Sequence, residues 1–496
     1  MGDTSSKGRG DLIRTDNRDA SKALRVVSST GSHGESMTRA GAELQRIQRG
    51  ELVKEAAVIG RQLLERRLRS AHGSVAWVGP KGYGTELTPL RIVQLGPHLY
   101  DGTAGIALFF AALERVLGDG DFRGSSLTAI APLRQKLADL TSDQERSVNL
   151  RLLLGGLIGV GSFIYSLLQI GELIQEPALF EEAHQATNLI TSERIAQDES
   201  VRLQTGCAGT ILSLLALNER ISKPNRYGKT PLQLASECAQ HLLTSRIFLG
   251  DRMAAWALSP GKPPLGGFSY GAAGICYSLL RLYDKTRKPE LWEAAQQGLA
   301  FVNSLYSMEQ KKWRDARFVL QSRYSPRKGA WKDWWASGTL ADLEEQTSRS
   351  DVEEKFLDMW CHGSSGICLG YVGALHINDS QEIRNIVYST AERIWPSADS
   401  LEMVLEVDDL CCGSFGFVEL FLSIYNRLDD EAALDKAHNV AKGIRGRAQL
   451  RGSYKLSAAR GTDAFAPSLF QGIAGVGYSL LRLAEPKSLP CLLLLE

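Results

Sequence analysis

The sequence predicts an all-α protein in which two concentric rings of helices form an α/α toroid. Three observations predict this fold. A short Gly-x-x-Gly block recurs seven times in the 496 residues, an apolar run follows each block, and more amphipathic segments separate the runs. Runs that are apolar on every face are typical of buried helices, and amphipathic segments are typical of helices that cover them. Seven such pairs favour a closed ring, with an open helical solenoid as the alternative.

The N-terminal part of the chain precedes these repeats. Residues 1–42 are rich in Ser, Gly, Asp, Arg and Thr and contain few large apolar residues, so we expect a flexible tail. From residue 43 to about 69, apolar residues recur at helical spacing and predict a helix. Residues 74–79 are expected to form a short extended segment. The toroidal domain is therefore expected to comprise residues 43–496.

The glycine blocks mark the start of each buried helix. Glycine allows backbones to approach one another at a crowded rim. The blocks also leave helix N-termini directed into a central bowl, where the positive end of the helix dipole favours anions. The seven blocks are Asp101–Gly105, Gly155–Gly159, Thr205–Gly209, Tyr270–Gly274, His362–Gly366, Cys412–Gly416 and Gln471–Gly475.

The longest interval between blocks separates the fourth from the fifth, and it indicates an insertion at about residues 307–350. This segment contains Trp313, Trp331, Trp334 and Trp335, with basic residues nearby. We interpret these tryptophans as local core, and an exposed surface that binds a peptide is the alternative.

Three of the eight cysteines lie at the fifth and sixth blocks, and they predict a metal site. Cys361 directly precedes His362, and Cys411 is followed by Cys412. Thiolates are ligands for zinc, which takes four ligands. Three thiolates with an open fourth position describe a catalytic site, whereas three thiolates with His362 describe a closed structural site. Asp408 and Asp409, which closely precede Cys411 and Cys412, are interpreted as a solvated turn, with a role in supporting the ligands as the alternative.

The remaining cysteines are interpreted as small buried hydrophobic residues, because their neighbours are apolar or small. So few cysteines in so long a chain do not form a disulfide scaffold. These residues are Cys207, Cys238, Cys276, Cys368 and Cys491.

Composition limits the possible partners and locations of the protein. The formal net charge of +1 gives no bias toward nucleic acid or anionic lipid. No apolar stretch approaches the roughly 20 residues that a transmembrane helix needs, and the N-terminus is polar rather than signal-like. We therefore expect a cytoplasmic protein with no nucleic-acid partner and no transmembrane segment.

Taken together, the blocks resemble those of the LanC-type lanthionine cyclases, most closely the C-terminal cyclase domain of class II lanthipeptide synthetases. The resemblance is carried by the seven glycine blocks, by Trp360-Cys361-His362-Gly363 and by Cys411-Cys412-Gly413. It extends from about residue 45 to the end of the chain. It implies an α/α toroid with Zn²⁺ at its centre, held by Cys361, Cys411 and Cys412, as in a subgroup of class II enzymes that uses three cysteines.

The chain also departs from this family in two places. Tyr270 occupies the position before the fourth block's glycine, where the family usually has a histidine that acts in proton transfer. An arginine often found shortly before the first zinc cysteine is absent from residues 356–360. Class II synthetases also carry a dehydratase domain ahead of the cyclase, and nothing in this sequence resembles it. We expect this dehydratase to be a separate or missing part.

The function that the resemblance implies is the addition of peptide cysteine thiols to dehydroalanine or dehydrobutyrine, which forms lanthionine or methyllanthionine rings in a dehydrated precursor peptide. The addition produces an enolate that must be protonated. We expect His362 to be the proton donor, with Tyr270 second and Asp101 in support. A zinc-containing peptide-binding module that has lost catalysis and assists a separate dehydratase is the alternative. An α/α-barrel carbohydrate enzyme would need paired carboxylates, and no block supplies an evident pair.

Overall fold

The computed structural model describes residues 31–71, 74–81, 90–118, 120–142, 152–257, 263–316, 356–394 and 405–496, with the side chains of 31–45 excepted. The chain forms two compact units, residues 1–50 and 51–496. Helix α1 (Gly31–Glu65) begins in the first unit, so residues 31–42 are helical where a flexible tail is predicted. Residues 1–30 lie outside the described part. All that follows concerns the second unit.

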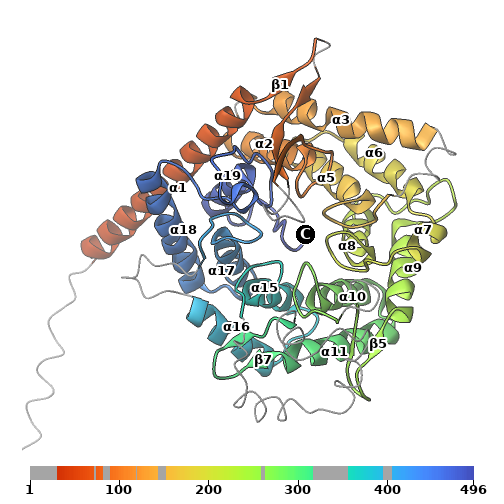
Figure 1. Ribbon diagram of the computed structural model, residues 1–496. Coiled ribbons are helices and arrows are strands. Elements are labelled where there is room, and N and C mark those ends of the chain that lie inside the picture. The colour runs from red at the N-terminus through yellow and green to blue at the C-terminus, as the bar shows by residue number, and fades with distance from the viewer. Residues whose placement is uncertain are drawn as a thin grey trace, which may run out of the picture. The chain divides into compact units, whose positions relative to one another are not determined.

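Seven helices form an inner ring in residues 51–496 (Figure 1). Each inner helix packs against the next one along the chain, and the last, α19, packs against the first, α2. This contact closes the ring and confirms the predicted toroid over the open solenoid. The inner helices are α2 (Thr103–Leu117), α5 (Val160–Leu173), α8 (Cys207–Asn218), α10 (Ala272–Thr286), α15 (Ser364–Ala374), α17 (Phe415–Leu428) and α19 (Ile473–Ala484).

An outer ring covers the inner one, because six inner helices are each followed by a helix that packs back against them. Residues 51–65 of α1 occupy the seventh outer place. There, Gly60 approaches Leu113 of α2, and Glu55 pairs with Arg445 of the last outer helix. The outer helices are α3 (Arg123–Ser142), α6 (Ala178–Ala186), α9 (Pro231–Thr244), α11 (Pro289–Ser304), α16 (Gln381–Ile394) and α18 (Glu431–Arg451).

Short elements connect the helices within the described residues. Four two-stranded antiparallel ribbons pair β1 (Leu68–Arg69) with β2 (Val75–Ala76), β3 (Val78–Lys81) with β4 (Arg91–Gln94), β5 (Ile247–Phe248) with β6 (Ala254–Ala255), and β7 (Tyr306–Ser307) with β8 (Lys312–Trp313). The other elements are α7 (Ser192–Ala196) and the 3₁₀ turns η1 (Thr187–Leu189) and η2 (Ser457–Ala459). Strands β2 and β3 confirm the extended segment predicted at residues 74–79.

Only the beginning of the predicted insertion at 307–350 lies in the described part of the chain. It contains the β7–β8 ribbon, where Trp313 is buried with 2% of its surface exposed. Trp313 is therefore core, as interpreted. Trp331, Trp334 and Trp335 lie outside the described residues.

The core sits between the two rings and continues into the axis of the inner ring. The five cysteines that were interpreted as hydrophobic residues are all buried. Residues 492–495 are buried as well, and Figure 1 shows the chain end inside the ring. Glu496 accepts hydrogen bonds from the hydroxyls of Tyr165 on α5 and Tyr277 on α10 and from the guanidinium of Arg281 on α10. The end of the chain thus fills part of the axis of the inner ring. The accessible end of the axis is the side of the loops, where the inner helices begin.

No helix in the described residues combines the length and the apolar character that crossing a membrane requires.

Each inner helix begins in the same way. An N–H at its start donates to the carbonyl oxygen seven residues earlier, over 2.8–3.2 Å, for example from Thr103 to Gly96 and from Ser364 to Leu357. The loop before each helix is thereby folded into a compact turn. The second block follows this pattern three residues later than its sequence suggests, because Gly159 rather than Gly156 caps α5. Gly159 has φ +129°, a conformation that favours glycine.

Close approach of these loops requires glycine at the third repeat. A Cβ on Gly209 would overlap the carbonyl oxygen of Leu203 and the backbone of Gly156, which belongs to the preceding repeat. We expect Gly209→Ala to lower the free energy of unfolding by about 1–3 kcal/mol, because backbone cannot yield as a flexible side chain can. Urea or thermal unfolding measures this change.

Gly446→Ala in α18 is the matched control, because nothing lies within 4 Å of its added Cβ. That substitution should leave stability unchanged or raise it by up to about 1 kcal/mol. Equal stability of wild type and Gly209→Ala would contradict the close approach of the loops.

Candidate functional site

Backbone hydrogen bonds link the loops of neighbouring repeats into a belt around the ring axis. At five of the seven steps, the residue two positions before the capping glycine donates its N–H to the carbonyl oxygen of its counterpart in the next repeat. These steps are Tyr100 to Leu157 (3.1 Å), Leu157 to Gln204 (3.2 Å), Ser269 to Cys361 (3.2 Å), Cys411 to Phe470 (2.9 Å) and Phe470 to Tyr100 (3.1 Å). The belt thereby joins most of the neighbouring loops to one another.

The belt divides the loop residues into two sets. The seven residues just named each stand two positions before a capping glycine. We call them the belt residues, and all of them are buried. We call the residues directly before the glycine the rim residues. All but Thr205 are partly exposed, so they face the open end of the ring. The rim residues are Asp101, Ile158, Thr205, Tyr270, His362, Cys412 and Gln471.

The three predicted metal ligands meet at this belt. The Sγ atoms of Cys361, Cys411 and Cys412 lie within 4.8 Å of one another. Two sulfurs bound tetrahedrally to one zinc ion at about 2.3 Å lie about 3.8 Å apart, so the cluster could hold zinc after the sulfurs approach by about 1 Å or less. Cys361 and Cys411 are buried, and Cys412 is partly exposed at the rim. Three donor atoms with an accessible side are suited to a catalytic ion.

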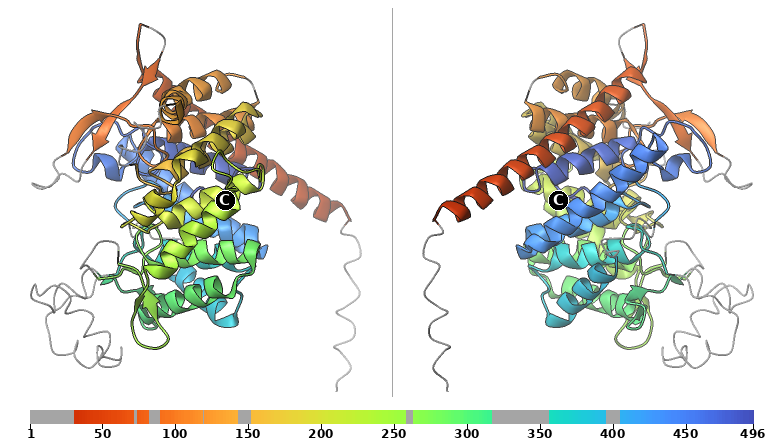
Figure 2. Two further views of the ribbon diagram at one scale, coloured as in Figure 1. Left: turned by 90° about the vertical axis from the view of Figure 1, so that its right-hand side faces the viewer. Right: turned by 90° about the vertical axis from the view of Figure 1, so that its left-hand side faces the viewer.

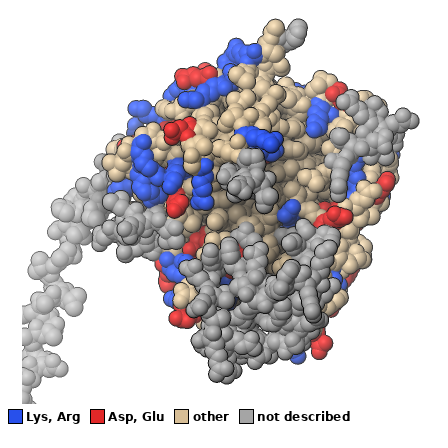
Figure 3. Space-filling view, viewed as in Figure 1, with Lys and Arg blue, Asp and Glu red and all other residues tan. Residues whose placement is uncertain are grey.

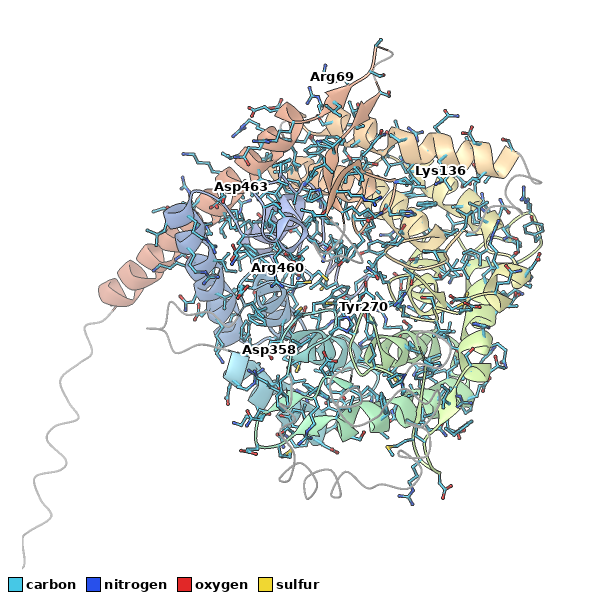
Figure 4. All side chains as sticks on the ribbon, viewed as in Figure 1. Arg69, Lys136, Tyr270, Asp358, Arg460 and Asp463 are labelled. Atoms are coloured by element: carbon cyan, nitrogen blue, oxygen red, sulfur yellow. The ribbon has the colours of Figure 1, made fainter. Side chains whose placement is uncertain are left out.

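His362 is not part of this cluster, although it follows Cys361 directly. Its ring instead stacks on Tyr270, with centroids 4.6 Å apart and planes 19° apart. The structure therefore favours the open site over the closed one. It also brings together the two residues that were expected to protonate the product, next to the sulfurs. Figure 4 shows Tyr270 in the loops at the centre of the ring.

Two residues that the sequence reasoning missed donate hydrogen bonds to the sulfurs. The Tyr100 hydroxyl donates to Cys411 Sγ over 3.0 Å, and the Gln471 amide donates to Cys412 Sγ over 3.6 Å. Both occupy a belt or rim position equivalent to a cysteine position, and aligning the repeats would have identified them. Burial, together with the nearby thiols, raises the pKa of Tyr100 well above its usual value, so its hydroxyl keeps its proton and remains a donor.

The thiols differ in their affinity for a proton. Hydrogen bonds from Cys361 and Cys411 hold the pKa of Cys412 well below that of an ordinary thiol. Burial instead raises the pKa of Cys411 well above it. Of the two adjacent cysteines, Cys412, which faces the rim, is therefore the more acidic.

Asp101, the third residue expected to act in the reaction, is held by a different contact. Its carboxylate pairs with Lys81 of β3, with Oδ2 and Nζ 3.5 Å apart, and about a third of its side chain is exposed. Asp101 therefore lies on the rim, and the residue directly before it, Tyr100, contacts the sulfur of Cys411.

Two buried aspartates tie the cysteine loops to the outer ring. Asp358 and Asp408 each stand three residues before a ligand, Cys361 or Cys411. Asp358 accepts from Arg393 of α16 at 2.5 Å and pairs with Lys312 at 3.1 Å.

Asp408 repeats this arrangement one repeat later. Its carboxylate accepts from Arg451 at 2.7 Å and Arg447 at 3.3 Å, both on α18, and from the N–H of Lys455. Asp409 is equally buried, and its Oδ1 accepts from the N–H of Cys412 at 2.9 Å. Burial, with the adjacent Cys412, raises the pKa of Asp409 to about 7. The solvated-turn interpretation of this pair is therefore wrong, since both carboxylates support the cysteine loop.

Charged side chains of both signs lie on the described part of this face of the molecule. Figure 3 shows lysine and arginine side chains interspersed with acidic ones around its edge. The two views in Figure 2 show the helices of both rings running between this face and the opposite one.

Comparisons with known proteins agree on the family of the repeats. The family model described as lanthionine synthetase C-like protein matches residues 93–494. A curated relative, glutathione S-transferase LANCL1 of Danio rerio, is 23% identical over 400 residues, which cover 79% of this chain and 84% of the relative.

Solved structures with similar helical rings include a nisin cyclase and a GH76 alpha-mannanase of Bacteroides thetaiotaomicron. The first has a TM-score of 0.49 and 16% identity, and the match covers 78% of this chain and 88% of that one. The second has a TM-score of 0.43 and 8% identity, and the match covers 88% of this chain and 95% of that one.

The anchoring role of Asp408 predicts a defect in both stability and metal binding. Asp408→Asn leaves Arg447 and Arg451 without their carboxylate, and breaking a buried ion pair in this way costs about 3–5 kcal/mol. We also expect zinc affinity to fall, about 10- to 100-fold, because the loop that carries Cys411 and Cys412 loses its support. Unfolding curves and competition with a zinc chelator measure the two effects.

Arg460→Ala is the matched control, because its pair with Glu406 is largely exposed and contributes little. If Asp408→Asn were no worse than this control in both measurements, the anchoring role would be refuted.

Proposed function

Since the chain belongs to the lanthionine synthetase C-like family, we propose that it is a zinc-dependent cyclase that adds peptide cysteine thiols to dehydroalanine or dehydrobutyrine. The products are lanthionine and methyllanthionine thioether rings in a ribosomal peptide. The observation that carries the proposal is the three-sulfur cluster at the belt, with Cys412 open to the rim and the Tyr270–His362 pair beside it.

Cys361, Cys411 and Cys412 are the residues that would hold the ion. Zinc held there supplies the Lewis acidity that ionises a substrate thiol at neutral pH. The protein does the rest of the work. The belt holds the ligands in place, the filled axis closes the site from below, and the open rim admits a peptide from the loop side.

His362 is the proposed proton donor to the α-carbon after the C–S bond has formed. Histidine is the side chain that most often transfers protons near neutral pH. The stacked ring of Tyr270 orients the imidazole, and the hydroxyl of Tyr270 is the second candidate donor. Asp101, the rim residue of the first repeat, pairs with Lys81 and has a supporting role.

The proposal extends to the setting of the reaction. The substrate is a dehydrated precursor peptide, the dehydratase is a separate or missing partner, and the protein acts in the cytoplasm. A zinc-containing peptide-binding module that has lost catalysis remains the second candidate, because Tyr270 stands at the family's histidine position. Asp101 is the only carboxylate among the seven rim residues, which weakens a carbohydrate-cleaving alternative that needs a carboxylate pair.

The decisive experiment combines zinc analysis with a ring-closure assay on a synthetic peptide that contains one dehydroalanine and one cysteine. We expect the purified protein to contain zinc and to convert the peptide to a thioether of equal mass, detected by loss of its reactivity with a thiol-alkylating reagent. Removing zinc with a chelator should abolish the reaction, and adding zinc back should restore it. A second assay supplies glutathione as the thiol, because the Danio rerio relative is named as a glutathione S-transferase.

Ligand variants provide the control for this experiment. Cys361→Ala should lose most of its zinc and its activity, whereas Cys368→Ala, another buried cysteine outside the cluster, should keep both. Bound zinc without any thioether formation would reject the cyclase in favour of the binding module.

The proposed acid makes a separate prediction. His362→Asn should retain zinc, because the imidazole is outside the sulfur cluster, but it should close rings about 10²- to 10⁴-fold more slowly, the usual contribution of a general acid. Zinc content and single-turnover rates test this. Wild-type rates in a zinc-loaded His362→Asn variant would remove His362 from the mechanism and leave Tyr270 as the candidate.

A further inference from the structure

Arg202 lies in the loop before the third inner helix, and the residue before it has an unusual backbone conformation. The preceding residue, Val201, is buried and has φ +49°. A β-branched residue rarely adopts this left-handed conformation, and such strain persists only where neighbouring contacts enforce it. The Asp198 carboxylate enforces it here, because it accepts from the N–H groups of Ser200, Val201 and Cys207. The strained turn therefore sets the direction of Arg202.

The Arg202 side chain is also held at its base. Its Nε donates to the hydroxyls of Ser200 at 3.0 Å and Thr205 at 2.8 Å, and Thr205 is the rim residue of this repeat. Within the described part of the chain, only Nε of this guanidinium is hydrogen-bonded, and no carboxylate pairs with it. Its two terminal nitrogens are thus available to an oxygen atom from a substrate.

The guanidinium points across to the next repeat. Its central carbon lies 4.9 Å from the centroid of the Tyr270 ring, a cation–π contact. Tyr270 in turn stacks on His362, which directly follows Cys361. Guanidinium, phenol and imidazole therefore form one continuous stack from the third repeat to the fifth, and the stack ends beside the sulfur cluster.

The proposed reaction needs a cation at such a place. The sulfur electron pair forms the C–S bond to the β-carbon, and the π electrons of the C=C bond move through the α-carbon onto the carbonyl oxygen. A proton then adds to the α-carbon and restores the C=O bond, so that S–H is added across C=C without any oxidant. Negative charge builds up on the carbonyl oxygen during the first step, and a positioned donor stabilises it.

We infer that Arg202 binds the carbonyl oxygen of the dehydro residue and stabilises the negative charge that develops there. The inference rests on the proposed function. None of the seven rim residues is a lysine or arginine, and Lys81 pairs with Asp101, so none of these residues competes with Arg202 for this role. Tyr270 then has a second role, since it holds the guanidinium plane on one side and the His362 ring on the other.

The test compares Arg202→Gln with wild type in the same ring-closure assay. We expect kcat to fall about 100-fold or more, as it does when a single oxyanion donor is removed, with a smaller change in KM. Zinc content and the absorption spectrum of the cobalt-substituted cluster should stay unchanged, because Arg202 does not contact a sulfur. Methylguanidinium added to Arg202→Ala should restore part of the rate, whereas methylammonium at the same concentration should not.

Arg246→Gln is the matched control. Arg246 also lies over an aromatic ring, that of Phe248, but at β5 on the outer side of the ring of helices, so its loss should leave kcat unchanged. Arg202→Lys keeps the charge without the planar donor pair, and it should retain an intermediate rate. Unfolding midpoints confirm that each variant is folded.

The outcomes separate the two proposals. An unchanged kcat in a folded Arg202→Gln variant of an active enzyme overturns the role of Arg202 and leaves the cyclase proposal intact. A lost rate with equal loss of zinc, or equal rescue by methylammonium, overturns it as well. A wild-type protein that forms no thioether from either the peptide or glutathione overturns the proposed function and the role of Arg202 with it.

Discussion

The belt of backbone hydrogen bonds is the constraint on which the rest of this structure depends. Each step joins the same position of two successive repeats, so the loops are held at a fixed offset from one repeat to the next. Because side chains alternate along the loop, the residue on the belt is buried and its neighbour faces the open end. The fold therefore provides seven equivalent positions, six of them partly exposed, and their chemistry depends on the residues placed there. At the fifth and sixth repeats, these residues and their belt neighbours supply the three sulfurs.

The repeats explain how much of this arrangement could be predicted from the sequence. The recurrence of glycine blocks predicted the double ring, and the position of the cysteines at two consecutive blocks, with the family resemblance, predicted that Cys361 would meet Cys411 and Cys412. In the structure, the cysteines stand at fixed offsets from the glycine that begins each block. The same offset would have identified Tyr100 and Gln471. The second block was misaligned because it contains three glycines, and only the backbone angle of Gly159 shows which of them caps the helix.

Other features could not be predicted, because they depend on contacts between distant residues. Asp408 and Asp409 suggested a solvated turn, since adjacent carboxylates are usually exposed. Their partners come from α18 and the segment after it, about forty residues later, and no local pattern reveals this pairing. The direction of Arg202 likewise depends on a strained Val201 and on a ring in the next repeat. The outer ring and the strained loop thus complete a site whose positions the inner ring defines.

The number of thiolates determines what the surrounding donors must do. A zinc ion held by the three thiolates would carry a formal charge of −1, and a fourth thiolate from a substrate would make it −2, whereas a site with two thiolates and a neutral histidine would reach only −1 with that substrate. The extra charge would make the substrate sulfur more electron-rich, but it would also weaken the acidification of an incoming thiol. Hydrogen bonds from Tyr100 and Gln471 draw electron density from Cys411 and Cys412, which offsets part of that charge without using a ligand position. Since burial keeps the Tyr100 hydroxyl protonated, this donor stays in place over the whole range in which a substrate thiol ionises. The third cysteine and the two neutral donors therefore have opposing effects on the charge of the cluster. Without the donors, an incoming thiol would be acidified less, and without the third cysteine, a bound thiolate would be less reactive.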